Sequence, residues 1–197
     1  MERKTDRRVR KTRAQLKSGL LNLLKKKSIQ DITVQELVDE VDINRSTFYL
    51  HYTDIYDMLR KIEDEFFESC MDVLKEYELP RDQVTSLQEF TEDYGVLTAL
   101  YHVVSDNSDL CLILIGPNGD LQFVNKVIAT INDQMEQRTR RVIQVKNQQS
   151  DYIYDYCMYG CIGLIRRWLE QGTPEPPEKM AQLTAQLLAA DLSYLQS

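Results

Sequence analysis

The chain has 197 residues, 43% of them hydrophobic, and a net charge of −7. This length allows one or two small domains with a core, and 7 Gly with 5 Pro favour helices over a sheet rich in turns. The longest apolar run, residues 110–115, is far shorter than the roughly 20 residues that span a membrane, and the basic N-terminus lacks the apolar segment of a secretory signal. We therefore expect an all-α, cytoplasmic protein.

The first predicted helix covers residues 5–27 and has two different faces. Its apolar positions recur at helical spacing and are Leu16, Leu20, Leu23 and Leu24. Residues 1–27 contain 11 basic and 2 acidic side chains, so a local positive field could attract a polyanion although the whole chain is acidic. An ordinary solvated helix face can also be basic, so this pattern alone leaves both interpretations open.

A second, short helix is expected to begin after Thr33 and to end near Val41. Thr33 stands three residues before Glu36, which is the capping-box spacing that satisfies free amides at a helix start. Residues 42–44 then form a tight turn, in which Asp42 or Asn44 can adopt backbone conformations that most residues avoid. A third helix follows over residues 45–52.

Two short helices joined by a tight turn, behind a longer bracing helix, are the helix-turn-helix pattern, whose second helix enters the major groove of DNA. Phe48 and Tyr52, spaced i and i+4, are expected to face inward toward Leu37 and Val41. The side chains expected to face DNA are Arg45, Ser46, Thr47, Tyr49, Leu50 and His51, with Thr33, Asn44, Thr53 and Tyr56 beside them. The alternative is a surface helix with a few stray aromatic residues.

A fourth helix begins at residues 53–54 and links two regions of opposite charge. It is expected to run to about Tyr77 with a buried apolar stripe. Residues 1–60 carry a net charge of +4 and the remainder −11. We therefore divide the chain into a DNA-binding domain, residues 1–55, with the linking helix to about 77, and a second helical domain, residues 78–197, that begins with a hinge, ELPRDQ.

The second domain is predicted to contain several further helices. The segment IGPNGD, residues 115–120, lacks the glycine spacing and the Lys-Ser/Thr ending of a phosphate-binding loop, so we interpret it as a turn before a helix at residues 121–135. A long apolar helix at residues 151–172 ends at Gly172, and after TPEPP a last helix reaches about Leu195.

The segment TVQELVDEVDINRSTFYLHYTDIYDML resembles the DNA-binding segment of TetR-family transcriptional regulators, most specifically in its S-T-F-Y-x-H-Y core at Ser46–Tyr52. The resemblance covers about the first 60 residues and departs from the family pattern at two positions. Asp42 replaces the usual turn glycine, and Ile55 replaces a lysine that commonly contacts phosphate. Thr53, Tyr56 or the basic N-terminal arm are candidates to replace that contact.

The resemblance also implies a homodimer in which the last two helices pair with those of a second subunit in a four-helix bundle. Gly160 and Gly163 would allow close helix approach, and Trp168 would be a large apolar anchor. The full set of expected interface residues is Tyr159, Gly160, Gly163, Ile165, Trp168, Leu183 and Leu187. Alternatively, these residues close only their own domain.

An effector pocket between the C-terminal helices is likewise implied by the resemblance. Its expected lining is aromatic and consists of Tyr94, Tyr101, Phe123, Tyr152, Tyr156 and Tyr159. Aromatic residues at helical spacing also occur in ordinary cores, so a plain core is the alternative. The sequence does not identify the effector.

Catalysis finds little support, because His51 and His102 are far apart in sequence and no motif of a hydrolase, metalloprotease or dinucleotide enzyme is present. The four cysteines, Cys70, Cys111, Cys157 and Cys161, are expected to be reduced, buried thiols. Cys157 and Cys161 lie one helical turn apart, but a metal site would need further ligands, so we expect no metal and no cofactor. The predicted function is a regulator that represses transcription from a palindromic DNA operator until an effector releases it. The alternative is a co-activator of the same fold whose C-terminal domain binds a partner protein.

Overall fold

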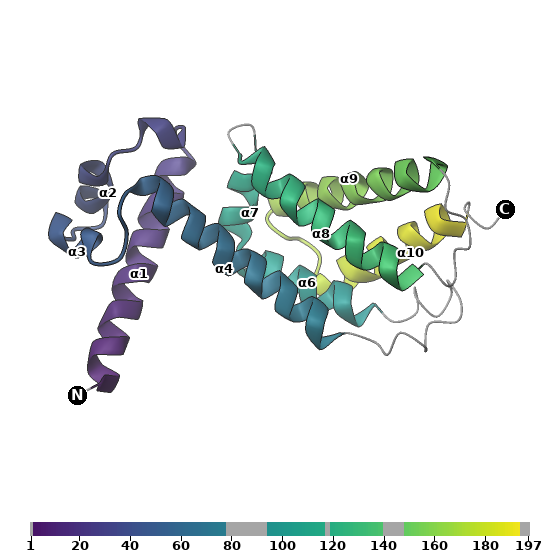
Figure 1. The fold of residues 1–197 in the computed structure, drawn as a ribbon, viewed down its shortest axis with the longest axis horizontal. Helices are drawn as coiled ribbons and strands as arrows, with labels where there is room; N and C mark the ends of the chain where they lie inside the picture. The colour runs from purple at the N-terminus through teal and green to yellow at the C-terminus, as the bar shows by residue number, and fades with distance from the viewer. Residues whose placement is uncertain (1, 78–93, 117–118, 140–147, 194–197) are drawn as a thin grey trace.

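The computed structural model describes residues 2–77, 94–116, 119–139 and 148–193, and all regular structure in these ranges is helical (Figure 1). The N-terminal elements are α1 (Glu2–Leu24), the 3-10 turn η1 (Ile29–Asp31), α2 (Val34–Glu40), α3 (Arg45–Tyr49) and α4 (Ile55–Glu76). The later elements are α6 (Gly95–Asp106), α7 (Ser108–Leu114), α8 (Leu121–Thr139), α9 (Gln148–Glu170) and α10 (Pro177–Ser193). The all-α prediction is confirmed.

The helix boundaries differ from the predicted ones mainly at α3 and near α7. Helix α3 ends at Tyr49 rather than at residue 52, because the chain turns there to reach Asp54, whose carboxylate accepts from the Asp57 amide and starts α4. The apolar residues before the turn at residue 115 form two helices, α6 and α7, which meet at Asn107. The predicted hinge at ELPRDQ lies outside the described residues.

The N-terminal helices α1 to α4 enclose a small core of fully buried side chains. Leu16 and Leu20 of α1, Leu37 of α2 and Phe48 of α3 are all completely buried. Gly19 allows α1 to approach α2 closely, because a Cβ at this position would lie 2.3 Å from Cγ1 of Val41. The apolar stripes in the sequence therefore meet as helical periodicity predicts.

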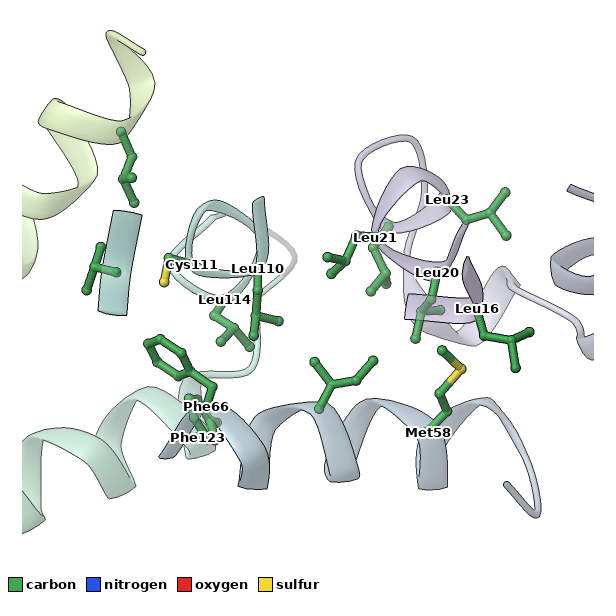
Figure 2. Packing of buried hydrophobic residues seen from close by; sticks show 14 of the residues in the cluster. Leu16, Leu20, Leu21, Leu23, Met58, Phe66, Leu110, Cys111, Leu114 and Phe123 are labelled. Atoms are coloured by element: carbon green, nitrogen blue, oxygen red, sulfur yellow. The ribbon is translucent and has the colours of Figure 1, made fainter. Parts of the chain in front are cut away.

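Helix α4 belongs to both halves of the molecule. Met58, near its start, lies below Leu16 and Leu20 of α1, whereas Phe66, two turns further on, lies beside Leu114 and Phe123 (Figure 2). The rings of Phe66 and Phe123 are 6.3 Å apart. One continuous helix thus contributes to the packing of the N-terminal helices and of the C-terminal bundle.

The C-terminal bundle is closed by α10 packing along α6 (Figure 1). Tyr101 of α6 lies at the centre of this contact, with its hydroxyl oxygen 2.7 Å from Oγ1 of the buried Thr184. Its ring packs edge-to-face on Trp168 of α9 at 5.3 Å between centroids. No helix within the described ranges is both long enough and apolar enough to cross a membrane.

Candidate nucleic-acid interface

Helix α2 and the following turn place α3 at one end of the molecule (Figure 1). Oγ1 of Thr33 accepts a hydrogen bond from the Glu36 amide, so half of the predicted capping box is formed. The Glu36 carboxylate contacts Nζ of Lys27 instead of completing the box. Asp42 adopts φ = 52°, the left-handed conformation that the usual glycine of this turn would supply.

Asn44 and Ser46 begin α3 and hydrogen-bond to each other. Oδ1 of Asn44 accepts from the Ser46 amide at 2.9 Å and from the Ser46 hydroxyl at 2.8 Å. Asn44 is therefore an N-cap with extended backbone, and Asp42 alone has the positive φ expected of one of these two residues. The local bond holds both polar side chains at the start of the exposed helix.

The aromatic residues of α3 and of the turn that follows it divide between an inner and an outer face, as predicted. Phe48 and Tyr52 are buried, whereas Tyr49 is exposed and Leu50 is 79% exposed. Phe48 packs against the ring of Tyr49 edge-to-face at 5.4 Å between centroids. Thr47 and His51 are only half-buried. An exposed leucine and tyrosine beside a fully buried phenylalanine leave a mixed polar and apolar surface available for contact.

Arg45 and Tyr49 form a pair on the outer face of α3. Nη2 of Arg45 donates to Oη of Tyr49 at 3.1 Å, and the guanidinium carbon lies 5.6 Å from the ring centroid. Both side chains are exposed. The guanidinium keeps other N–H groups for a base edge or a phosphate, because one hydrogen bond uses only part of its five donors.

Lys61 and Arg13 hold the end of α3 and were not identified from the sequence. Nζ of Lys61 donates to the carbonyl oxygen of His51 at 3.1 Å and lies 5.3 Å from the ring centre of Tyr52. Nε of Arg13 donates to Oη of Tyr52 at 3.4 Å, and Arg13 also pairs with Glu65. These long-range contacts join α1, α3 and α4.

The residues that flank α3 are exposed where the sequence predicted DNA contacts. Thr33 and Thr53 are exposed, as is the Tyr56 ring. Asp57 accepts from the Thr53 amide at 3.0 Å, and this bond, followed by the Lys61 ammonium, lowers the pKa of Asp57. Ile55 is buried, so this side chain faces the core and is not available to contact phosphate.

The N-terminal half of α1 extends beyond the other N-terminal helices (Figure 1). The basic side chains described on this part of α1 are all exposed and are Arg7, Arg8, Arg10 and Lys11. These four side chains form a positive strip on the exposed start of α1, which belongs to the same N-terminal domain as α3. Such a strip can attract phosphate groups without reading a base sequence.

The six aromatic residues expected to line an effector pocket do not share one environment. Tyr152, Tyr156 and Tyr159 of α9 are 59% to 69% exposed. Tyr101 is buried against Trp168 and Thr184, and Phe123 is buried against Phe66. Tyr94 is half-buried. The expected lining therefore separates into core residues and surface residues, because these three tyrosines of α9 are exposed.

The residues expected at a subunit interface also separate into two groups. Tyr159, Leu183 and Leu187 are large exposed hydrophobic side chains, and a Cβ at Gly160 or Gly163 would have no atom within 4 Å. Ile165 is half-buried.

Trp168 differs from the other expected interface residues, because it is 2% exposed within its own chain. Its Nε1 donates to the carbonyl oxygen of Glu175 at 2.8 Å. Trp168 is therefore an anchor inside the subunit, where it joins α9 to α6 and to the connection that precedes α10.

The cysteines are free thiols with little tendency to ionise. Burial raises the pKa of Cys157 and Cys111 to about 12 and that of Cys70 and Cys161 to about 11. Within the described ranges, no three His, Cys, Asp or Glu side chains are grouped so that they could hold a metal ion.

Comparison with known proteins connects the chain with transcriptional regulators. Residues 91–190 match the family of TetR-type transcriptional regulator C-terminal regions. An uncharacterised helix-turn-helix transcriptional regulator of Bacillus subtilis, YxbF, is 34% identical over 55 residues. That match covers 28% of this chain and 14% of the length of YxbF.

Solved structures of regulators have the same fold at low sequence identity. A TetR transcriptional regulator from Streptococcus agalactiae is 18% identical, and the alignment covers 95% of this chain and 99% of that one with a TM-score of 0.57. The regulator FadR from Bacillus subtilis, solved with stearoyl-CoA, is 10% identical, with 90% and 98% of the chains covered and a TM-score of 0.61.

Proposed function

The chain belongs to the TetR family of transcriptional regulators, and on this premise we propose that it binds a palindromic DNA operator as a homodimer and represses transcription until an effector releases it. This is a family of regulators rather than of enzymes. The proposal assigns DNA binding to the N-terminal helices and dimerisation to α9 and α10.

The observation that carries the DNA-binding proposal is the division of α3 into two faces. Phe48 fixes the inner face in the core, while Arg45, Tyr49 and Leu50 are presented together on the outer face. An arginine can donate two hydrogen bonds to guanine, and an apolar side chain can contact a thymine methyl. The positive strip of α1 would add phosphate contacts that are independent of sequence.

Dimerisation is supported by the exposed apolar side chains of the last two helices. Tyr152, Tyr156 and Tyr159 on α9, with Leu183 and Leu187 on α10, are large hydrophobic residues exposed in the single chain. Apolar surface of this kind commonly marks an interaction site. The open space around Gly160 and Gly163 would let a second helix approach closely.

A homodimer of this kind predicts the form of the operator. Two copies of α3 related by a two-fold axis would enter successive major grooves about 34 to 36 Å apart, so the two half-sites should be inverted repeats. We assign effector binding to the C-terminal bundle, without the exposed tyrosines of α9 as its lining. Effector binding would release DNA by favouring an arrangement with a different α3 spacing.

The test begins with selection of DNA fragments by the full-length protein, followed by affinity measurements on the selected operator and on a scrambled duplex. Arg45→Ala should weaken operator binding with little effect on scrambled DNA. Lys75→Ala is the control, since Lys75 is an exposed cation at the far end of α4. The absence of any selected sequence, or equal loss in both variants, would overturn the proposal.

A co-activator that binds a partner protein would use the same exposed face of α9 and α10. The two possibilities differ in the oligomeric state of the purified protein. A stable dimer whose dissociation also abolishes operator binding supports the homodimeric regulator. A monomer that selects no DNA would instead favour the partner-binding alternative.

A further inference from the structure

Glu63 of α4 is a buried carboxyl group whose Oε1 has no hydrogen-bond partner. The residue is 5% exposed. The contrast with Thr184, the other buried polar side chain in the described residues, is informative, because Oγ1 of Thr184 bonds to Met180 and lies close to Tyr101. A buried carboxylate oxygen without a partner carries a substantial desolvation penalty, so its retention here calls for an explanation.

Glu63 lies where α4 meets the start of α8. The adjacent Asp64 pairs with Lys126 of α8 at 3.6 Å, and Lys126 also lies 4.3 Å from the ring centre of Phe67. Asp120 begins α8, since its Oδ1 accepts from the amides of Gln122 and Phe123 at 2.8 and 3.0 Å.

The charges around Glu63 are mostly of its own sign. Asp64 on α4 and Asp120 at the start of α8 both repel an ionised Glu63, while Lys126 attracts it. Two lysines, one in α1 and one just after it, are engaged elsewhere, because Lys17 donates to Oδ1 of Asn107 at 3.2 Å and Lys25 pairs with Asp109 of α7 at 2.7 Å. The contact between α4 and α8 therefore holds more negative than positive charge.

We propose that Glu63 is a proton-sensitive latch, which is neutral when α8 is packed on α4 and which loosens this contact when it loses its proton. The burial of Glu63, its unpartnered Oε1 and the nearby negative charges of Asp120 and Asp64 all disfavour the charged form. Helix α4 continues into the N-terminal domain, where Met58 packs on α1. A change in the packing of α8 on α4 would therefore be transmitted to that domain through one continuous helix.

Ionisation of Glu63 should lower the stability of the folded protein over a defined pH range. Burial, followed by the charges of Asp120 and Asp64, raises the pKa of Glu63 from 4.5 to about 7. Below pH 4.5 the group is neutral in both the folded and unfolded states and adds no cost. Between 4.5 and 7 the unfolded state ionises first, so stability falls as pH rises, and above pH 7 the full cost is present.

The first experiment compares urea unfolding of the full-length protein and of Glu63→Gln between pH 5 and 8. Glutamine preserves the shape but cannot ionise. The wild type should lose stability relative to the variant as pH rises from 5 to 7.5, with a levelling above pH 7.5. Parallel pH profiles for the two proteins would overturn the proposal.

A second experiment does not depend on how well Glu63→Gln folds. Carbon-13 NMR of labelled glutamate carboxyls should find one group in the wild type that titrates near pH 7. Asp120→Asn retains an N-cap oxygen for α8 but removes one facing charge, so the midpoint of that group should move to lower pH. A wild-type spectrum in which every glutamate titrates near pH 4.5 would show that the latch does not exist.

Discussion

Nη2 of Arg45 donates to the hydroxyl oxygen of Tyr49 at 3.1 Å on the exposed surface of α3, so two side chains assigned to DNA contact are already bound to each other in the free protein. The tyrosine limits the rotamers of the arginine before DNA arrives. A preorganised guanidinium loses less conformational entropy when it binds.

The Arg45–Tyr49 pair predicts non-additive losses of operator affinity. Arg45→Ala should cost about 1 to 3 kcal/mol per half-site, the usual value of a good base contact. Tyr49→Phe, which removes only the hydroxyl, should weaken operator binding in the wild type but have little further effect after Arg45→Ala. Fluorescence anisotropy on the four proteins of this double-mutant cycle measures the coupling. Fully additive losses would mean that the two residues contact DNA independently.

Phe48 in α3 and Leu50, the residue that follows α3, should differ in their effect on stability. Phe48→Ala removes a fully buried ring and should reduce the free energy of unfolding by about 3 to 5 kcal/mol. Leu50→Ala is the control at the C-cap of α3, because its side chain is exposed, and it should leave stability nearly unchanged. Urea denaturation checks both values. Equal destabilisation by the two changes would contradict the orientation of α3.

The exposed leucines of α10 test the proposed dimer. Leu187→Asp should shift the protein toward monomer in sedimentation experiments, because a buried unpaired carboxylate in the interface is costly. Leu50→Asp introduces the same change at the exposed leucine that follows α3 and should not alter the sedimentation coefficient. If Leu187→Asp remains as dimeric as the wild type, the subunit contact lies on another surface.

Even a methyl side chain at position 19 should lower the stability of the protein. Gly19→Ala would gain about 1 kcal/mol of helix propensity, but its methyl group would meet Val41, and overpacking typically costs about 1 to 3 kcal/mol. We expect a net destabilisation by thermal or urea unfolding. The double variant Gly19→Ala, Val41→Ala removes the obstructing methyl groups and should recover part of the loss. Without any recovery, the close contact between α1 and α2 is not the cause.

The thiols should react slowly with alkylating and disulfide reagents. Cys157 and Cys161 have pKa values raised to about 12 and 11, so their thiolate fraction at pH 7.5 is far below that of a free cysteine. Reaction of the native protein should therefore be much slower than that of the urea-unfolded chain. Rapid native labelling at Cys157 would indicate that α9 and α10 separate frequently.

The features that could be predicted from the sequence are those set by neighbours within one or two helical turns. Thr33 and Glu36 indicated the start of α2, and the spacing of Phe48 and Tyr52 indicated the inner face of α3. Both were confirmed. Asp42 was recognised as a turn residue because few side chains tolerate a positive φ.

The features that escaped prediction depend on contacts between distant parts of the chain. Arg13 is 39 residues from Tyr52, and no local pattern shows that they meet. In α9, aromatic and aliphatic residues occur around much of the helix, so periodicity could not decide that Trp168 faces inward and Tyr156 outward. The choice is made by α6 and the chain before α10, which together enclose the indole.

The sharing of α4 between both cores limits how this regulator can be recombined with its relatives. A chimera that exchanges DNA specificity would have to be joined inside α4, between Met58, whose partners are on α1, and Phe66, whose partners are on α7 and α8. A junction placed after Glu76 would transfer the whole of α4 from the donor protein. The bundle of the recipient would then pack against α4 side chains that differ from its own. Compatible partners are therefore those whose α4 sequences agree in the second half of the helix, whatever their recognition residues.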